Sequence, residues 1–136
     1  MKTLSELRDE VNLNTTLDDK VEAIIYKSGQ MKVPKSQAFI QQTFYALHKE
    51  CPELLDGFIF DESGITPFSD ELDSALFRLE ASNVLHTLNP AYKDYHIEDS
   101  VDVLKKSYDK FQKMSSEIDR CAKMFSELVE SQVKAE

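Results

Sequence analysis

Residues 67–83 of the 136-residue chain, PFSDELDSALFRLEASN, carry the clearest signals for one helix. Ser69 has the side chain of an N-cap, and the two acids that follow it favour the positive end of a helix dipole. Four apolar residues then recur at helical spacing and predict a buried stripe: Leu72, Ala75, Leu76 and Leu79. Asn83 is suited to a left-handed C-cap. The stretch therefore predicts a helix between Ser69 and Asn83.

Two helices and one short strand are expected before this helix. Thr16 is suited to cap a first helix, and Gly29 is suited to end it. Pro34 favours the first turn of a second helix, whose stripe is Ile40, Phe44, Leu47 and Cys51. The aromatic and β-branched run at 58–60, FIF, predicts a strand. Residues 1–15 are weakly patterned and predict a short helix or a loosely docked arm.

Residues 84–97 predict a β-hairpin, because Asn89-Pro90 is a turn signal between two extended segments. Residues 98–136 contain neither Gly nor Pro and predict one long C-terminal helix of about 50 Å. Its apolar stripe alternates steps of three and four, as in a heptad seam. A core of this size cannot cover such a length, so either the helix bends or its far end packs on another subunit, and the second alternative predicts a homodimer through this helix. The residues expected to form the dimer contact are Phe111, Met114, Ile118, Cys121, Phe125 and Leu128.

This order of elements predicts a mainly helical, α+β fold of winged-helix type, with a small hairpin as the wing. The expected organisation is an N-terminal arm over residues 1–15, a winged-helix-like domain over 16–97 and the long helix over 98–136. Fold alone does not define function, so the function has to be argued from the side chains.

Residues 35–85 resemble the Panacea/YwgA-like domains of small bacterial, archaeal and phage proteins. The matching segments are QQTFYAL at 41–47, GFIF at 57–60, PFSDEL at 67–72, Leu79-Glu80 and Val84-Leu85. The family has a Tyr-Gly-Pro turn before its Ser-x-Glu-Leu helix start, whereas this chain has Gly64-Ile65-Thr66-Pro67. The resemblance implies a fold related to winged helices and a non-enzymatic interaction module that serves as an antitoxin or adaptor.

Charge is unevenly distributed along the chain. The net charge is −9, and residues 52–83 alone hold eight acids and one base. A winged helix that reads DNA places its third helix in the major groove, where phosphate contacts need Lys and Arg. An acidic third helix is either an ordinary solvated helix surface or a face that binds a basic partner protein. The residues expected to contact that partner are Asp70, Asp73, Phe77, Glu80, Tyr92 and Tyr95.

The alternative function is a dimeric transcription regulator that binds DNA. The basic residues available for it are Lys27, Lys32 and Lys35, which cluster between the first two helices, together with Arg78 and Lys93. The cluster could touch a phosphate backbone but is poorly placed to read bases.

Catalytic and targeting motifs are missing from the sequence. Cys51, Cys121 and the three scattered histidines match no zinc spacing, and no phosphate-binding or nucleophile motif occurs. His86 and His96 are expected to face each other across the hairpin, and Asp61 and Glu62 to be exposed turn residues. We therefore expect a non-enzymatic, cytoplasmic protein with no cofactor, no metal and no membrane association.

Overall fold

The computed structural model describes residues 2–87 and 94–135. Over these residues the chain is mainly helical, as expected, with a small antiparallel sheet. The helices are α1 (Leu4–Asn12), α2 (Leu17–Ser28), α3 (Gln37–Glu50), α4 (Asp70–Ala81), α5 (Val101–Asp109) and α6 (Ser115–Ala135). The strands are β1 (Lys32–Pro34), β2 (His86–Thr87) and β3 (Asp94–His96), and Glu98–Ser100 and Gln112–Met114 form short 3₁₀ turns.

Side chains predicted to cap helices do so. Thr16 and Asp19 form a reciprocal capping box at the start of α2, and Gly29 ends this helix in the left-handed conformation at φ 76°. Ser69 accepts a hydrogen bond from the amide of Leu72 at the start of α4. Asn83 has a φ of 65°, which allows the chain to leave α4 toward the sheet. Residues 4–12 form the short helix that was one of the two predictions for the N-terminus.

The strands of the sheet differ from those predicted: residues 58–60 form no strand, and residues 32–34 form one. The expected strand at 58–60 is wrong, because this segment pairs with no strand, and only an isolated bridge joins Asp61 to Phe68. Its rings instead anchor the loop: Phe58 packs against Phe44 of α3, with ring centroids 6.3 Å apart. The strand lies earlier, at β1, and the order of strands is β1-β3-β2. The tip of the expected hairpin, residues 88–93, lies outside the described residues.

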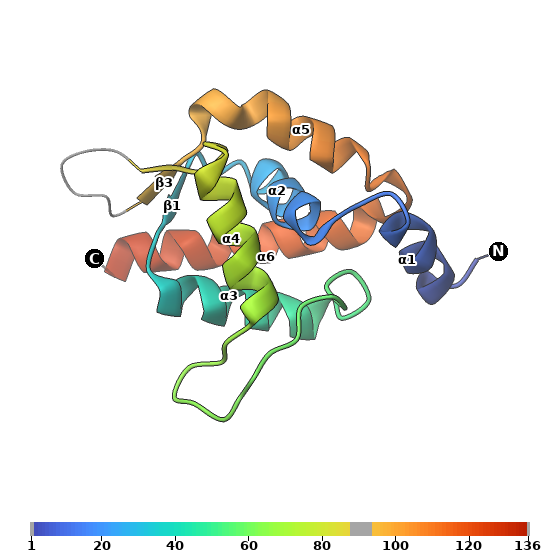
Figure 1. The fold of residues 1–136 in the computed structure, drawn as a ribbon, viewed down its shortest axis with the longest axis horizontal. Coiled ribbons are helices and arrows are strands. Elements are labelled where there is room, and N and C mark those ends of the chain that lie inside the picture. Colours follow the sequence, from blue (N-terminus) through green and yellow to red (C-terminus); the bar gives the residue numbers. More distant parts are fainter. Residues whose placement is uncertain (1, 88–93, 136) are drawn as a thin grey trace.

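The single long C-terminal helix is also wrong. The amides of Lys110 and Phe111 bond to carbonyls three residues earlier, so α5 ends and a 3₁₀ turn leads into α6. This break lets both segments pack against α2, which lies between them (Figure 1). The heptad-like stripe is therefore buried within one chain.

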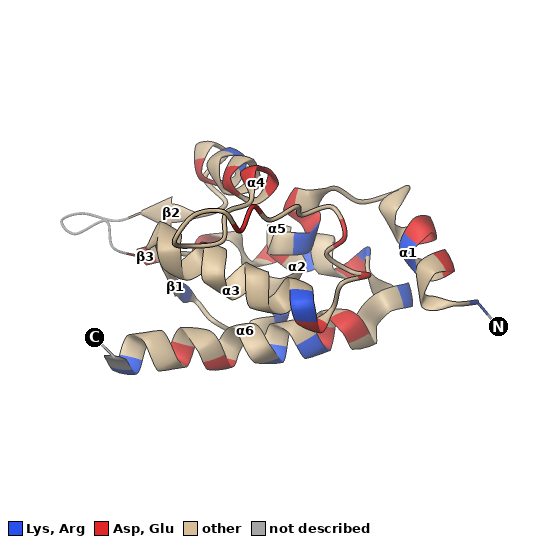
Figure 2. Ribbon diagram, turned by 90° about the horizontal axis from the view of Figure 1, so that it is seen from below, with Lys and Arg blue, Asp and Glu red and all other residues tan. Residues whose placement is uncertain are grey.

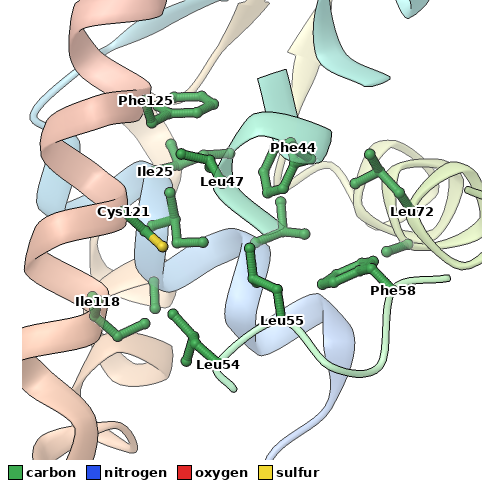
Figure 3. Packing of buried hydrophobic residues seen from close by; sticks show 14 of the residues in the cluster. Ile25, Phe44, Leu47, Leu54, Leu55, Phe58, Leu72, Ile118, Cys121 and Phe125 are labelled. Carbon is green, nitrogen blue, oxygen red and sulfur yellow. The ribbon is translucent and has the colours of Figure 1, made fainter. Parts of the chain in front are cut away.

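One hydrophobic core joins all parts of the chain. It includes Ile25 of α2 and extends through Leu47 of α3 and Leu72 of α4 to Phe125 of α6 (Figure 3). The rings of Phe44 and Phe125 meet edge to face, 5.8 Å apart. Val11 of α1 belongs to the same core. Burying one such aliphatic or aromatic side chain stabilises the fold by about 1.5–3 kcal/mol.

Candidate functional site

A surface groove of about 330 Å³ lies between the first turns of α3, one face of α4 and strand β3. Figure 2 shows α4 above α3, with the strands to the left of α4. The residues that line it are Lys35, Gln37, Ile40, Asp73, Leu76, Phe77, Glu80 and Tyr95. Small-molecule and peptide sites are usually concave, with a few polar groups around an apolar floor, and this groove has that composition.

The apolar part of the groove comes from α3 and α4. Ile40 is almost fully buried and Leu76 is half-buried against the core. Phe77 is 73% exposed and stands at the rim. Asp73, Leu76, Phe77 and Glu80 follow the i, i+3, i+4, i+7 spacing that places residues on one helix face. The Phe77 ring is therefore accessible to another molecule at the edge of the groove.

The polar part is a ring of hydrogen bonds between elements. Gln37 Nε2 donates to Asp73 Oδ1 at 3.3 Å, and Lys35 Nζ donates to Glu80 Oε1 at 3.0 Å. The Tyr95 hydroxyl donates to the other oxygen of Glu80 at 3.4 Å. Burial, followed by the nearby carboxylates of Glu80 and Asp73, raises the pKa of Tyr95 to about 12. Tyr95 therefore stays a neutral donor at physiological pH.

Four of the residues expected to contact a protein partner line this groove: Asp73, Phe77, Glu80 and Tyr95. Asp70 is exposed in the first turn of α4 but does not line it, and Tyr92 lies outside the described residues. Lys35 was expected only as a contact of the DNA-binding alternative, Ile40 and Leu76 only as core residues, and Gln37 was not predicted as a site residue. Nothing local in the sequence indicates that Lys35 and Gln37 reach the acidic residues of α4.

The one base of α4 is held by an ion pair. Both the Nε and Nη2 atoms of Arg78 donate to the carboxylate of Asp18, in the first turn of α2, at 2.7–3.2 Å. The carboxylate hydrogen bond raises the pKa of Arg78 further. The exposed face of α4 therefore presents Asp70 and Asp73 with no base of the same helix left to offset them, whereas Glu80 is paired with Lys35.

The lysines of the DNA-binding alternative also contact an aromatic ring or a carboxylate within the chain. Lys27 lies 5.7 Å from the ring of Tyr108, Lys32 lies 3.6 Å from Asp94, and Lys35 lies 3.0 Å from Glu80. Exposed ion pairs are individually weak, yet each one lowers the local positive potential that a phosphate backbone needs. Lys93 lies outside the described residues.

Five of the six residues expected at a dimer contact are instead core residues of the single chain. Phe111, Met114, Ile118, Cys121 and Phe125 are buried in its own core. Their packing accounts for the apolar stripe without a second subunit. Leu128 is half-buried and lines a second groove of about 260 Å³ between α3 and α6, together with Phe39, Gln42, Thr43, Ala46, Ser131 and Gln132. The homodimer itself stays a prediction.

A buried polar cluster joins α2 to α5. The Ser107 hydroxyl lies 3.2 Å from Asp19 Oδ1 and 3.1 Å from Glu22 Oε2, and Lys110 Nζ lies 3.2 Å from Asp19 Oδ2. One hydroxyl proton cannot serve two carboxylates at once. Burial, only partly offset by the Ser107 hydrogen bond, raises the pKa of Glu22 to about 7. Glu22 is therefore protonated over much of the mildly acidic range.

The remaining predictions from the sequence concern metal binding and a few single side chains. The residues that the structure describes hold no group of three or more His, Cys, Asp or Glu that could bind a metal ion. His86 and His96 are cross-strand partners, as expected, and Asp61 and Glu62 are exposed. None of the described helices combines the length and apolar character needed to cross a membrane. No protein-family model, curated protein or solved structure matches the chain.

Proposed function

We propose that the chain is a non-enzymatic interaction protein of the antitoxin or adaptor type, built on a winged-helix-like scaffold. The groove between α3, α4 and β3 is its binding site for a partner protein. One observation carries this proposal: four residues expected from the sequence to contact a partner line a single groove, with Phe77 exposed at its rim. The resemblance to the Panacea/YwgA-like domains stays a prediction and favours the same class of function.

The order of elements supports the scaffold. A helix, a strand, two helices and a pair of strands follow one another from α2 to β3, and the first strand lies beside the last. In a winged helix the third helix is the one that recognises a partner macromolecule. In this chain that position is occupied by α4, which forms one wall of the groove.

The charges favour a partner protein over nucleic acid. The exposed face of α4 carries carboxylates, and Arg78 is paired with Asp18. Carboxylates next to a phosphate backbone oppose binding, whereas they attract a basic peptide. We therefore expect the partner to present an apolar side chain for the contact with Phe77 and Leu76, flanked by a Lys or Arg for Asp73.

Fluorescence anisotropy of the full chain with three labelled probes tests this proposal. The probes are a synthetic peptide that alternates Lys with Leu, the same peptide with Glu for Lys, and a random-sequence DNA duplex. We expect saturable binding of the basic peptide, weakened by salt, and no binding of the other two. Binding to DNA at low salt that disappears when Lys27, Lys32 and Lys35 are replaced by Glu would instead support the transcription regulator.

Matched variants locate the binding. Phe77→Ala and Asp73→Asn should each weaken the basic peptide several-fold, since one removes the apolar anchor and the other a carboxylate. Ile65→Ala and Asp102→Asn remove an exposed apolar side chain and an exposed acid outside the groove, and should leave binding unchanged. Equal loss of binding in both pairs of variants would show that the peptide binds non-specifically, and would refute the proposal that the groove is the binding site.

A further inference from the structure

The two cysteines of the chain meet in the core. Cys51 caps the C-terminus of α3 and Cys121 lies in α6, and both are fully buried. The Cys51 thiol donates to the backbone carbonyl of Glu117 at 3.7 Å. In an α-helix this carbonyl also accepts the amide of the residue four positions later, which is Cys121. Side chains of a helix lean toward its N-terminus, so the Cys121 side chain lies over the turn whose carbonyl the Cys51 thiol contacts, and the two thiols are neighbours.

Arg120 makes the two thiols unequal. Its half-exposed guanidinium forms ion pairs with Glu50, which precedes Cys51, and with Glu117, whose carbonyl accepts from the Cys51 thiol, so a positive charge lies close to that thiol. Hydrogen bonds from Cys121 and Arg120 lower the pKa of Cys51. The contact with Cys51 and burial raise the pKa of Cys121. A thiolate is the nucleophile in disulfide exchange, so Cys51 is the reactive partner of the pair.

We propose that Cys51 and Cys121 form a reversible redox site, which reacts with a low-molecular-weight disulfide to link the end of α3 to α6. The Cys51 thiolate attacks one sulfur of the small disulfide, forms a mixed disulfide and expels one thiolate. The Cys121 thiol then loses its proton, and its sulfur attacks Sγ of Cys51 and expels the second thiolate. Two protein thiols are oxidised to one disulfide, and the small disulfide is reduced to two thiols.

The disulfide would link Cys51 to Cys121 away from the groove, so its formation does not depend on the proposed function. A disulfide between residues so far apart in sequence restricts the unfolded chain strongly, so the oxidised form should unfold at a higher temperature than the reduced form. Burial protects the reduced thiols from random oxidation, while the positive charge of Arg120 makes Cys51 the first of the two to react.

The experiment equilibrates the folded full chain in buffers of reduced and oxidised glutathione at graded ratios. Free thiols are then trapped by alkylation, and the intact mass is measured. We expect a monomeric species that has lost two hydrogens and carries no glutathione, and a peptide map that joins Cys51 to Cys121. Thiols that stay reduced at every ratio, or a disulfide found only between chains, would overturn the proposal.

Variants separate the two roles. Cys121→Ala should accumulate the mixed disulfide on Cys51, whereas Cys51→Ala should leave Cys121 unmodified. Arg120→Gln should slow the first step several-fold near neutral pH, and Lys123→Gln, an exposed cation on the same helix, should not. Circular dichroism shows whether each variant is folded. If a cysteine variant does not fold, the glutathione titration of the unmodified chain decides the proposal. Faster modification of Cys121 than of Cys51 would contradict the assignment.

Discussion

Arg78 of α4 and Asp18 of α2 form a two-pronged ion pair, with their closest atoms, Nη2 and Oδ1, 2.7 Å apart. The contact joins two elements that are 60 positions apart in sequence. It also occupies the one basic side chain of the helix that a DNA-binding winged helix would place in the major groove. The pair therefore links the stability of the fold to the acidic character of its proposed recognition helix.

A double-mutant cycle measures this pair. Arg78→Ala and Asp18→Ala should each lower the free energy of unfolding, with a coupling between them of about 0.2–1 kcal/mol, because half of the Arg78 side chain is exposed. Urea unfolding of the four chains gives the value. A coupling of zero would mean that the pair does not contribute to stability.

The pH dependence of stability should report on Glu22. Its pKa in the folded chain is about 7, above the ordinary value of 4.5, so the folded state binds more protons than the unfolded state between these values. Stability should therefore be highest below about pH 4.5, as far as this group is concerned, and decrease as pH rises to about 7. The decrease should be about 3 kcal/mol, since the two pKa values differ by about 2.5 and one pKa unit corresponds to about 1.4 kcal/mol.

Glu22→Gln tests the assignment by urea unfolding at a series of pH values. The amide cannot ionise, so the variant should lose this decrease and exceed the unmodified chain in stability at pH 8. Glu130→Gln, which changes an exposed acid of α6, should keep the profile of the unmodified chain. If Glu22→Gln and the unmodified chain have profiles of the same shape, Glu22 does not titrate in this range.

Phe125 should contribute to stability as a core residue. It is 1% exposed and packs edge to face against Phe44. Phe125→Ala should lower the free energy of unfolding by about 3–5 kcal/mol, with no dependence on protein concentration. Val133→Ala, on the same helix but 53% exposed, should have an effect below about 0.5 kcal/mol. A concentration-dependent loss at Phe125 would place the residue in an intermolecular contact.

The predicted homodimer has only Leu128 left of its expected contact residues. We expect self-association to use the uncharged groove between α3 and α6, because two copies of net charge −9 repel each other elsewhere. Sedimentation velocity at tens of micromolar should show a dimer, and Leu128→Glu should dissociate it, whereas Val103→Glu on α5 should not. A monomeric unmodified chain would refute the homodimer.

Local signals in the sequence predicted the helices of this fold better than its contacts. The caps at Thr16, Ser69 and Gly29 depend on neighbouring residues and were predicted correctly. Strand β1 was missed because its three residues pair with β3, about 60 positions later, and carry no alternating pattern of their own. The break near Phe111 was missed because it follows from packing two helices on α2.

The same distinction applies to the candidate site. The residues of α4 were predicted from helical spacing and charge, both of which are visible in one segment. Gln37 was missed, and Lys35 was predicted only for the DNA-binding alternative, because their places here come from hydrogen bonds to Asp73 and Glu80 across the groove. The ion pair between Arg78 and Asp18 could not be predicted from the sequence either, because the two residues are 60 positions apart.

The most direct test of the central claim is an NMR titration of the ¹⁵N-labelled full chain with the basic Lys-Leu peptide. The account predicts shift changes confined to the amides around the groove, at Gln37, Ile40, Leu76, Phe77 and Tyr95, and their loss in Phe77→Ala. Shift changes centred on Lys27 and Lys32, or spread evenly over the acidic surface, would contradict a partner-binding site in the groove.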